Sequence, residues 1–172
     1  MSPAIWVMLA VCLQRAVELP YARANASRLL SQGARESSPG HYPILMLFHA
    51  SWLAALFALA FQGAQVHWGL LLFYGVLQLL RLWTIASLGR HWTTRIITLP
   101  GMPLTRRGPY RFMRHPNYAI VCAELAVLPW ALGSWKLAGV FSILHLPLLA
   151  HRIRCEERAL AAARAFDSPN HL

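Results

Sequence analysis

Five long apolar runs constrain the fold of this chain more than any other feature of its sequence. The runs cover residues 3–19, 43–62, 66–88, 117–133 and 135–150. Each is close to the roughly 20 residues that a helix needs to cross the hydrocarbon core of a bilayer. Apolar residues make up 57% of the chain and charged residues 13%, a balance far from that of soluble domains. We therefore expect an all-α, polytopic membrane protein with about five transmembrane helices in a single domain over residues 1–172.

The positive charge is distributed unevenly over the connections between these runs. The formal net charge is +10, and the arginines gather in residues 20–42, in residues 89–116 and after residue 150. By the positive-inside rule these segments and the C-terminus are cytoplasmic, while the N-terminus lies outside, which requires an odd number of spans. The same rule explains the charge without a nucleic-acid partner. Short loops and the preference for Arg over Lys favour a bacterial inner membrane with a cytoplasmic active site.

Several charged side chains fall inside the apolar runs, and four of them bear on the fold and the site. Arg15 and Glu18 lie near the inner end of the first run, and Arg81 lies near the inner end of the third. We expect these three side chains to snorkel to the membrane interface. Glu124 lies deeper in the fourth run, where a carboxyl group must find partners. It is a candidate site residue, with a structural hydrogen bond to a neighbouring helix as the alternative.

Residues 107–118 combine cations, aromatic rings and a His-Pro pair directly before an apolar run. Pro116 suits the first turn of a helix, and His115 would lie at or near its cap, so that the free N–H groups of that turn are available to an acceptor. No Gly-rich dinucleotide loop, phosphate-binding loop or nucleophile elbow occurs, and the three cysteines lack the spacing of metal ligands. These absences exclude soluble Rossmann-type enzymes, and we expect no metal site.

The last apolar run is predicted to continue as a helix beyond the membrane. Residues 150–166 contain no helix breaker and are rich in Ala, Arg, Leu and Glu, which are good helix formers. At about 100° per residue, His145, Arg152 and Glu156 share one face of that helix, whereas Glu157 points elsewhere. The alternative is an ordinary pair of Arg and Glu on a solvated helix.

Taken together, these residues resemble the isoprenylcysteine carboxyl methyltransferase family. The resemblance covers roughly residues 90–160 and rests on Leu104-Thr105, Gly108-Pro109-Tyr110, Arg114-His115-Pro116-Asn117-Tyr118, and Arg152 with Glu156-Glu157. It implies a multi-span membrane enzyme that takes S-adenosylmethionine from the cytosol and a lipophilic acceptor from the bilayer. Through residues 89–97 and Glu124 the chain looks most like the short bacterial members that methylate a hydroxyl of long-chain alkylpyrones or alkylresorcinols.

The resemblance also implies roles for individual positions. The expected cofactor-binding residues, with Arg114 included for its cation, are Met102, Pro103, Leu104, Thr105, Tyr110, Arg114, His115, Pro116, Asn117, Tyr118 and Glu156. A sulfonium favours carboxylates and aromatic faces, and the carboxylate of the cofactor favours N–H groups or a cation. Arg152 is expected to face the acceptor and to stabilise the oxyanion that develops there. A phenol or enol must lose a proton, for which His115 and Glu124 are the candidate bases.

Three other functions are compatible with parts of the sequence. A carboxyl methyltransferase for a prenylcysteine-like substrate would use the same motifs, but the short tail lacks the further aromatic residues of the longer family members. A sterol-type NADPH-dependent reductase resembles residues 114–118, yet its motif continues with Gly-Glu where this chain has Ile120-Val121. A non-enzymatic protein that binds anionic lipid would explain the basic loops, at about 1 kcal/mol per Arg. We expect no obligate protein partner in any of these cases.

Overall fold

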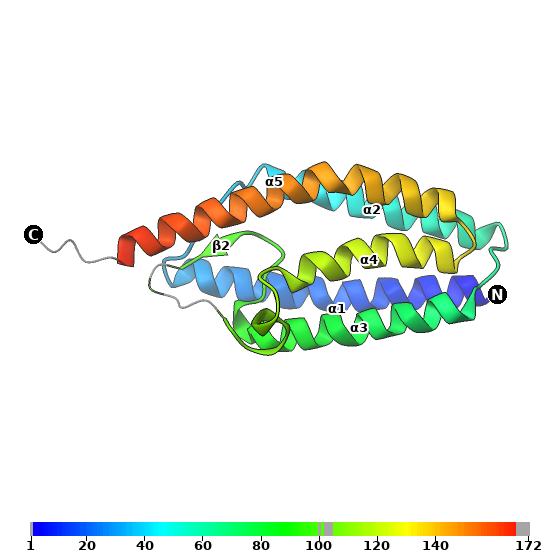
Figure 1. Ribbon diagram of the computed structural model, residues 1–172, viewed down its shortest axis with the longest axis horizontal. Coiled ribbons are helices and arrows are strands. Elements are labelled where there is room, and N and C mark those ends of the chain that lie inside the picture. Colours follow the sequence, from blue (N-terminus) through cyan, green and yellow to red (C-terminus); the bar gives the residue numbers. More distant parts are fainter. Residues whose placement is uncertain (1, 100, 102–104, 168–172) are drawn as a thin grey trace, which may run out of the picture.

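The computed structural model describes residues 2–99, 101 and 105–167, with side chains as far as residue 163. Its helices are α1 (Pro3–Ser31), α2 (His41–Phe61), α3 (Trp68–Leu88), α4 (Pro116–Ala131) and α5 (Trp135–Asp167). Figure 1 shows them as an elongated bundle in which consecutive helices run in opposite directions. The N-terminus and the α2–α3 and α4–α5 turns lie at one end, which we call the hairpin end. The loop before α4 and the end of α5 lie at the other end, which we call the loop end.

Three helical segments of the described chain are long and apolar enough to cross a membrane. They are Pro3–Ser31, His41–Phe61 and Trp68–His91. The five expected apolar runs thus correspond to five helices, although α4 has only 16 residues and α5 has 33. As predicted, α5 continues well beyond its apolar part.

The first helix is longer than its apolar run indicates. The sequence places the end of that run at residue 19, but α1 continues through Pro20 to Ser31. A proline removes one hydrogen bond from a helix interior, and a long helix packed against its neighbours tolerates this loss. The added turns carry Asn25, which is buried and donates to the backbone oxygen of Trp92 at 2.9 Å. This contact fastens α1 to the connection between α3 and α4, residues 89–115, which we call the Arg-rich loop.

A small β-ladder is the one addition that the described residues make to the expected all-α class. β1 (Arg35–Glu36) pairs antiparallel with β2 (Ile97–Thr98), so that Glu36 lies opposite Ile97. An ion pair of 3.2 Å also joins the side chain of Glu36 in β1 to that of Arg95, two residues before β2. The pairing ties the segment after α1 to the Arg-rich loop, which also contains two short 3₁₀ turns, η1 (Gly89–His91) and η2 (Gly108–Arg111).

Gly108 lets the Arg-rich loop lie directly on the end of α3. Its backbone has a φ of +56°, in the left-handed region that favours glycine. A Cβ atom at this position would lie 2.0 Å from the Oγ atom of Ser87 and 3.1 Å from Nε1 of Trp83. The close approach of η2 to α3 therefore requires glycine here, and it fixes the start of the segment that carries the motif residues.

The apolar core lies between the helices towards the hairpin end. Its buried members come from α1 to α4 and the turn that follows α4: Ala4, Met8, Val11, Trp52, Leu56, Ala60, Tyr74, Leu125, Leu128 and Leu132. Large apolar side chains such as Leu47, Leu72 and Ile143 are exposed on the outside of the bundle, as a lipid-facing surface requires. The loop end is free of this core, and its polar residues surround a cavity instead.

Candidate active site

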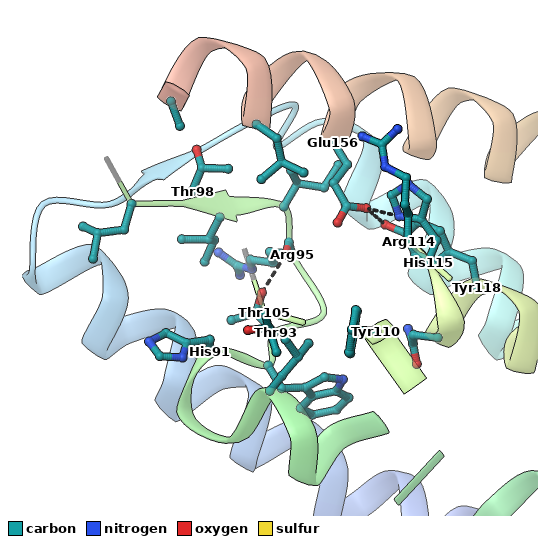
Figure 2. A pocket seen from close by; sticks show the side chains of 18 of the residues that line it. His91, Thr93, Arg95, Thr98, Thr105, Tyr110, Arg114, His115, Tyr118 and Glu156 are labelled. Atoms are coloured by element: carbon teal, nitrogen blue, oxygen red, sulfur yellow. Dashed lines mark hydrogen bonds and ion pairs between the residues drawn. The ribbon is translucent and has the colours of Figure 1, made fainter. Parts of the chain in front are cut away.

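A cavity of about 860 Å³ occupies the loop end of the bundle, and we call it the large cavity. Residues between 88 and 99, together with Gly101, Thr105 and Arg106, form one wall, residues between 110 and 118 form another, and α5 closes the third side (Figure 2). The expected site residues that line it are Thr105, Tyr110, Arg114, His115, Asn117, Tyr118, Arg152 and Glu156. Pro116 is buried at the start of α4 behind this wall. Met102, Pro103 and Leu104 lie outside the described residues.

The hydroxyl of Tyr118 joins the two expected functional residues of α5. It donates a hydrogen bond to Oε2 of Glu156 and accepts one from Nε of Arg152 at 2.9 Å. Arg152 also donates from a terminal nitrogen to the backbone oxygen of Thr94 at 2.7 Å, and its guanidinium lies over the Tyr118 ring. The guanidinium is thus held by hydrogen bonds from two separate elements.

His115 packs against this group at the start of α4. Its ring stacks on the Tyr118 ring with 5.3 Å between centroids, and its Nδ1 lies 3.6 Å from Oε2 of Glu156. Glu157 points outward instead, with 45% of its side chain exposed and Arg114 at 3.5 Å. The structure therefore confirms the helical periodicity that separated Glu156 from Glu157.

Tyr110 presents a neutral ring to the large cavity. Burial raises the pKa of its hydroxyl well above the ordinary value, and the nearby charge of Glu156 raises it further. The group keeps its proton throughout the range in which proteins are stable. It can therefore donate a hydrogen bond, and its uncharged aromatic face is available to a cation.

A second, smaller cavity of about 210 Å³ adjoins the first, deeper in the bundle, and we call it the small cavity. Most of its exposed surface is apolar, and Leu45, Leu53 and Val121 are among the residues that line it, although charged residues also reach its wall. The residues that line both cavities are Trp92, Thr93, Asn117, Tyr118 and Arg152. These five form the shared wall.

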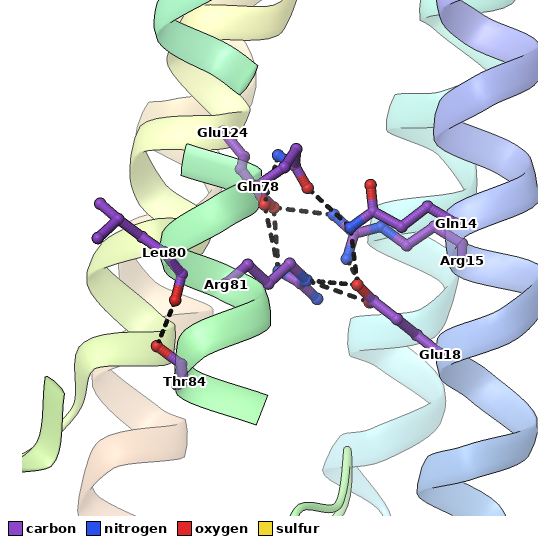
Figure 3. Close-up of polar contacts among 8 residues, drawn as sticks. All are labelled: Gln14, Arg15, Glu18, Gln78, Leu80, Arg81, Thr84 and Glu124. Atoms are coloured by element: carbon purple, nitrogen blue, oxygen red, sulfur yellow. Dashed lines mark hydrogen bonds and ion pairs between the residues drawn. The ribbon is translucent and has the colours of Figure 1, made fainter. Parts of the chain in front are cut away.

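Two arginines and two glutamates meet at one side of the small cavity, between α1, α3 and α4 (Figure 3). Arg15 contacts Glu18 and Glu124 at 2.8 Å each, and Arg81 contacts Glu18 at 2.9 Å and Glu124 at 3.1 Å. The expectation that Arg15, Glu18 and Arg81 snorkel to the interface is wrong. Arg81 is 6% exposed and Glu18 is 8% exposed, because each neutralises the other inside the bundle. We call these four residues the charge cluster.

The two candidate bases lie in different places. His115 lines the large cavity, whereas Glu124 lines the small one as part of the charge cluster. His145 also lines the small cavity, and its Nδ1 lies 3.7 Å from Sγ of Cys122. The structure thus brings Arg152 and Glu156 together with residues 115–118, but it does not add Glu124 to that group.

Some site residues were not anticipated from the sequence. Trp92 and Thr93 belong to the shared wall, and the backbone of Thr94 holds Arg152. The hydroxyl of Tyr42 lies 3.2 Å from Oγ1 of Thr94 and so links α2 to the same segment. The resemblance included residues 89–97 without giving them a role, and the run Trp-Thr-Thr was the available signal.

Comparison with known proteins settles the family of this chain. The sequence pattern of the isoprenylcysteine carboxyl methyltransferase family matches residues 70–162, more than half of the chain. The chain belongs to this family. The methyltransferase pattern spans α3, the Arg-rich loop, α4 and the part of α5 that lines both cavities. The family consists of membrane-embedded methyltransferases that use S-adenosylmethionine as the methyl donor, and membership supports that general activity here.

A curated relative extends the similarity beyond the matched region. The chain is 36% identical over 160 residues to the "Uncharacterized protein YpbQ" of Bacillus subtilis (strain 168). The alignment covers 90% of this chain and 95% of that relative. No solved structure matches the chain. The family is therefore known, while the acceptor must be inferred from the geometry of the site.

Proposed function

We propose that this protein is an S-adenosylmethionine-dependent O-methyltransferase whose acceptor is the hydroxyl of a long-chain phenol or pyrone. The observation that carries the proposal is the pair of adjoining cavities, one large and lined by polar groups and one small and mainly apolar. Methyl transfer needs a donor and an acceptor that meet in line. Arg152 and Tyr118, in the shared wall, lie where such a meeting would take place.

The residues of the large cavity fit the proposed cofactor. Its volume of about 860 Å³ is ample for a nucleoside with an amino-acid side arm. Oδ1 of Asn117 is buried without a hydrogen-bond partner among the described residues, so a ligand donor could satisfy it. Nε2 of His115 also lacks a hydrogen bond among these residues, although the Glu157 carboxylate lies 3.9 Å away. Glu156 offers a carboxylate, and Tyr110 offers an aromatic face. When bound, S-adenosylmethionine supplies the methyl group that is transferred.

The small cavity fits the ring of a lipophilic acceptor. An apolar cavity of about 150 Å³ is enough to hold benzene, so about 210 Å³ accommodates a substituted six-membered ring. A long alkyl chain exceeds that volume and must extend out between the helices into the bilayer. Arg152 would hold the acceptor oxygen at the shared wall and stabilise its negative charge. Of the two candidate bases we favour His115, because both oxygens of Glu124 already accept hydrogen bonds from arginines.

The position of the cavities supports a proposal for the membrane placement. The large cavity lies at the loop end, where the arginine-rich connections gather, and the small cavity adjoins it. By the positive-inside rule we place that end at the cytoplasmic face of a bacterial inner membrane. The cofactor would then enter from the cytosol and the acceptor from the surrounding lipid. Residues 90–160 form the cofactor-binding part of a single integral domain.

Binding of S-adenosylhomocysteine, the product of the cofactor, tests this proposal most directly. We expect saturable binding in titration calorimetry of the detergent-purified protein, and no binding of NADPH. Glu156→Gln removes a charge that faces the large cavity and should weaken binding about 10- to 100-fold, as expected for a charge-assisted hydrogen bond. The control is Arg158→Gln, which changes an exposed charged residue of α5 that does not line the large cavity and should leave the affinity unchanged.

Two results would contradict the assignment. Unaltered affinity in Glu156→Gln would remove this residue from the cofactor site. Binding of NADPH without S-adenosylhomocysteine would move the protein to the reductases. If neither compound binds to a folded sample, the alternative of a lipid-binding protein is the one to follow.

Tyr118→Phe tests the positioning role of the Tyr118 hydroxyl. The change keeps the ring that stacks on His115 but removes one of the hydrogen bonds that fix Arg152. We expect kcat to fall about 10- to 100-fold, because small displacements at a reacting centre are costly, with the affinity for S-adenosylhomocysteine within about threefold of wild type. Equal losses in kcat and in cofactor affinity would show that the hydroxyl serves cofactor binding instead.

A further inference from the structure

The charge cluster can offer hydrogen-bond donors to the small cavity, but its carboxylates have little capacity to accept further hydrogen bonds. Each of the four carboxylate oxygens of Glu18 and Glu124 already accepts two hydrogen bonds, from the two arginines and from Gln14 and Gln78. A guanidinium carries five N–H groups. Arg15 uses one terminal nitrogen on Glu18 and the other on Glu124. Among the described residues, these are the two hydrogen bonds that the guanidinium of Arg15 donates, so further N–H groups could donate to a ligand.

Arg15 is the member of the charge cluster that a ligand can best reach. Its side chain is 21% exposed, against 8% for that of Arg81 and 2% for that of Glu124. Arg15 also lines the small cavity. N–H groups without a partner are costly within a membrane, so a group in that cavity that accepts a hydrogen bond would be favoured.

The distance between Arg15 and the shared wall limits the size of a ligand that could contact both. Glu124, which Arg15 contacts, follows Tyr118 on α4 by six residues, or about 9 Å along the helix axis. That separation is comparable to one six-membered ring with a hydrogen bond of about 2.8 Å at each edge. The apolar walls between these two points suit the faces of such a ring.

We infer that Arg15 forms a second polar subsite, which selects acceptors carrying a second oxygen on the same ring, in the meta position to the hydroxyl that is methylated. The inference rests on the proposed function and deepens it. One hydroxyl lies at the shared wall, where Arg152 holds it for methylation. The other oxygen, a carbonyl, ether or hydroxyl, accepts a hydrogen bond from Arg15. Resorcinol- and pyrone-type rings meet this requirement, whereas a phenol with a single oxygen does not.

A pair of ligands that differ by one hydroxyl tests the subsite. We would measure binding of 5-pentylresorcinol and 3-pentylphenol to the detergent-purified full chain by calorimetry, which needs no turnover. The wild type should bind the resorcinol at least about tenfold more tightly than the phenol, because only the resorcinol can form the additional hydrogen bond to the charged Arg15. In Arg15→Gln the ratio should fall below about threefold, with the affinity for the phenol unchanged. Arg23→Gln, an exposed position further along α1, is the matched control and should keep the ratio of the wild type.

Because Arg15 also neutralises buried carboxylates, thermal melting must show that each variant is folded. If Arg15→Gln is not folded, Arg15→Lys replaces it, since the lysine keeps the charge but loses the forked donor geometry. The ratio should shrink in this variant too. Equal affinities in the wild type, or a full preference that survives in a folded Arg15 variant, would overturn the inference. Failure of the wild type to bind S-adenosylhomocysteine is a separate result, which would contradict the proposed function and not the subsite.

Discussion

Arg152→Ala should lower kcat for methyl transfer by about 100- to 1,000-fold, the loss typical of removing one group that stabilises an oxyanion. In the structure this guanidinium is fixed by Tyr118 and by the backbone of Thr94, and it lines both cavities. The affinity for S-adenosylhomocysteine should change little, because Glu156 keeps its place at the other side of the Tyr118 hydroxyl. Single-turnover transfer of a labelled methyl group to 5-pentylresorcinol measures the rate, and calorimetry measures the affinity.

The control for this experiment is Arg154→Ala, which removes an exposed arginine two residues further along α5. Its transfer rate should equal that of the wild type. An undiminished rate in Arg152→Ala would exclude this residue from the reaction. A parallel loss of S-adenosylhomocysteine binding would assign Arg152 to the cofactor site instead.

Glu124→Ala should lower the free energy of unfolding by about 3–5 kcal/mol, the usual effect of leaving a buried charge without its partner. Glu124 neutralises both Arg15 and Arg81, and after its removal two cations would share the single carboxylate of Glu18. Thermal unfolding in detergent, followed by circular dichroism, measures the loss. Glu36→Ala provides the comparison, because its pair with Arg95 is partly exposed and should contribute less than about 1 kcal/mol.

A double variant separates charge from packing in this result. Arg81→Met with Glu124→Leu removes one cation and one anion together and leaves the Arg15–Glu18 pair intact. We expect it to be clearly more stable than Glu124→Ala, since apolar residues of similar volume often replace a buried ion pair without loss. If the double variant is as unstable as the single one, the loss arises from packing, and the charge cluster is not what stabilises the bundle.

The sequence predicted those parts of the fold that depend on local pattern. Apolar runs of membrane length identified the five helices, and the absence of a breaker after Ala150 identified the extension of α5. Helical periodicity also placed Arg152 and Glu156 together. The end of α1 was missed because the apolar run ends at residue 19, whereas the helix continues to Ser31 and its Asn25 contacts the backbone of the Arg-rich loop.

The charge cluster could not be predicted in the same way. Its members come from three helices, and Glu124 is separated from Arg15 by 109 residues. Arg15, Glu18 and Arg81 each have an ordinary explanation near a helix end. Glu124 was expected to need a partner, but only the tertiary structure shows that the four side chains meet. The two cavities likewise could not be predicted from hydropathy. Their walls combine loop segments and helices that are far apart in the sequence. The motif residues of the site were recognisable through the family resemblance and not through local pattern.

The charge cluster also affects how the chain can enter the membrane. α1 brings Arg15 and Glu18 together and is balanced by itself, but α3 carries Arg81 as an unpaired cation and α4 carries Glu124 as an unpaired anion. A single charge costs about 2.5–3.5 kcal/mol at the centre of an inserting helix and less towards an end, where Arg81 lies. α3 and α4 therefore insert more favourably as a pair than in succession, although the whole Arg-rich loop separates them in the sequence. The loop between these helices lines the large cavity, so we expect that cavity to form only once both helices are in place.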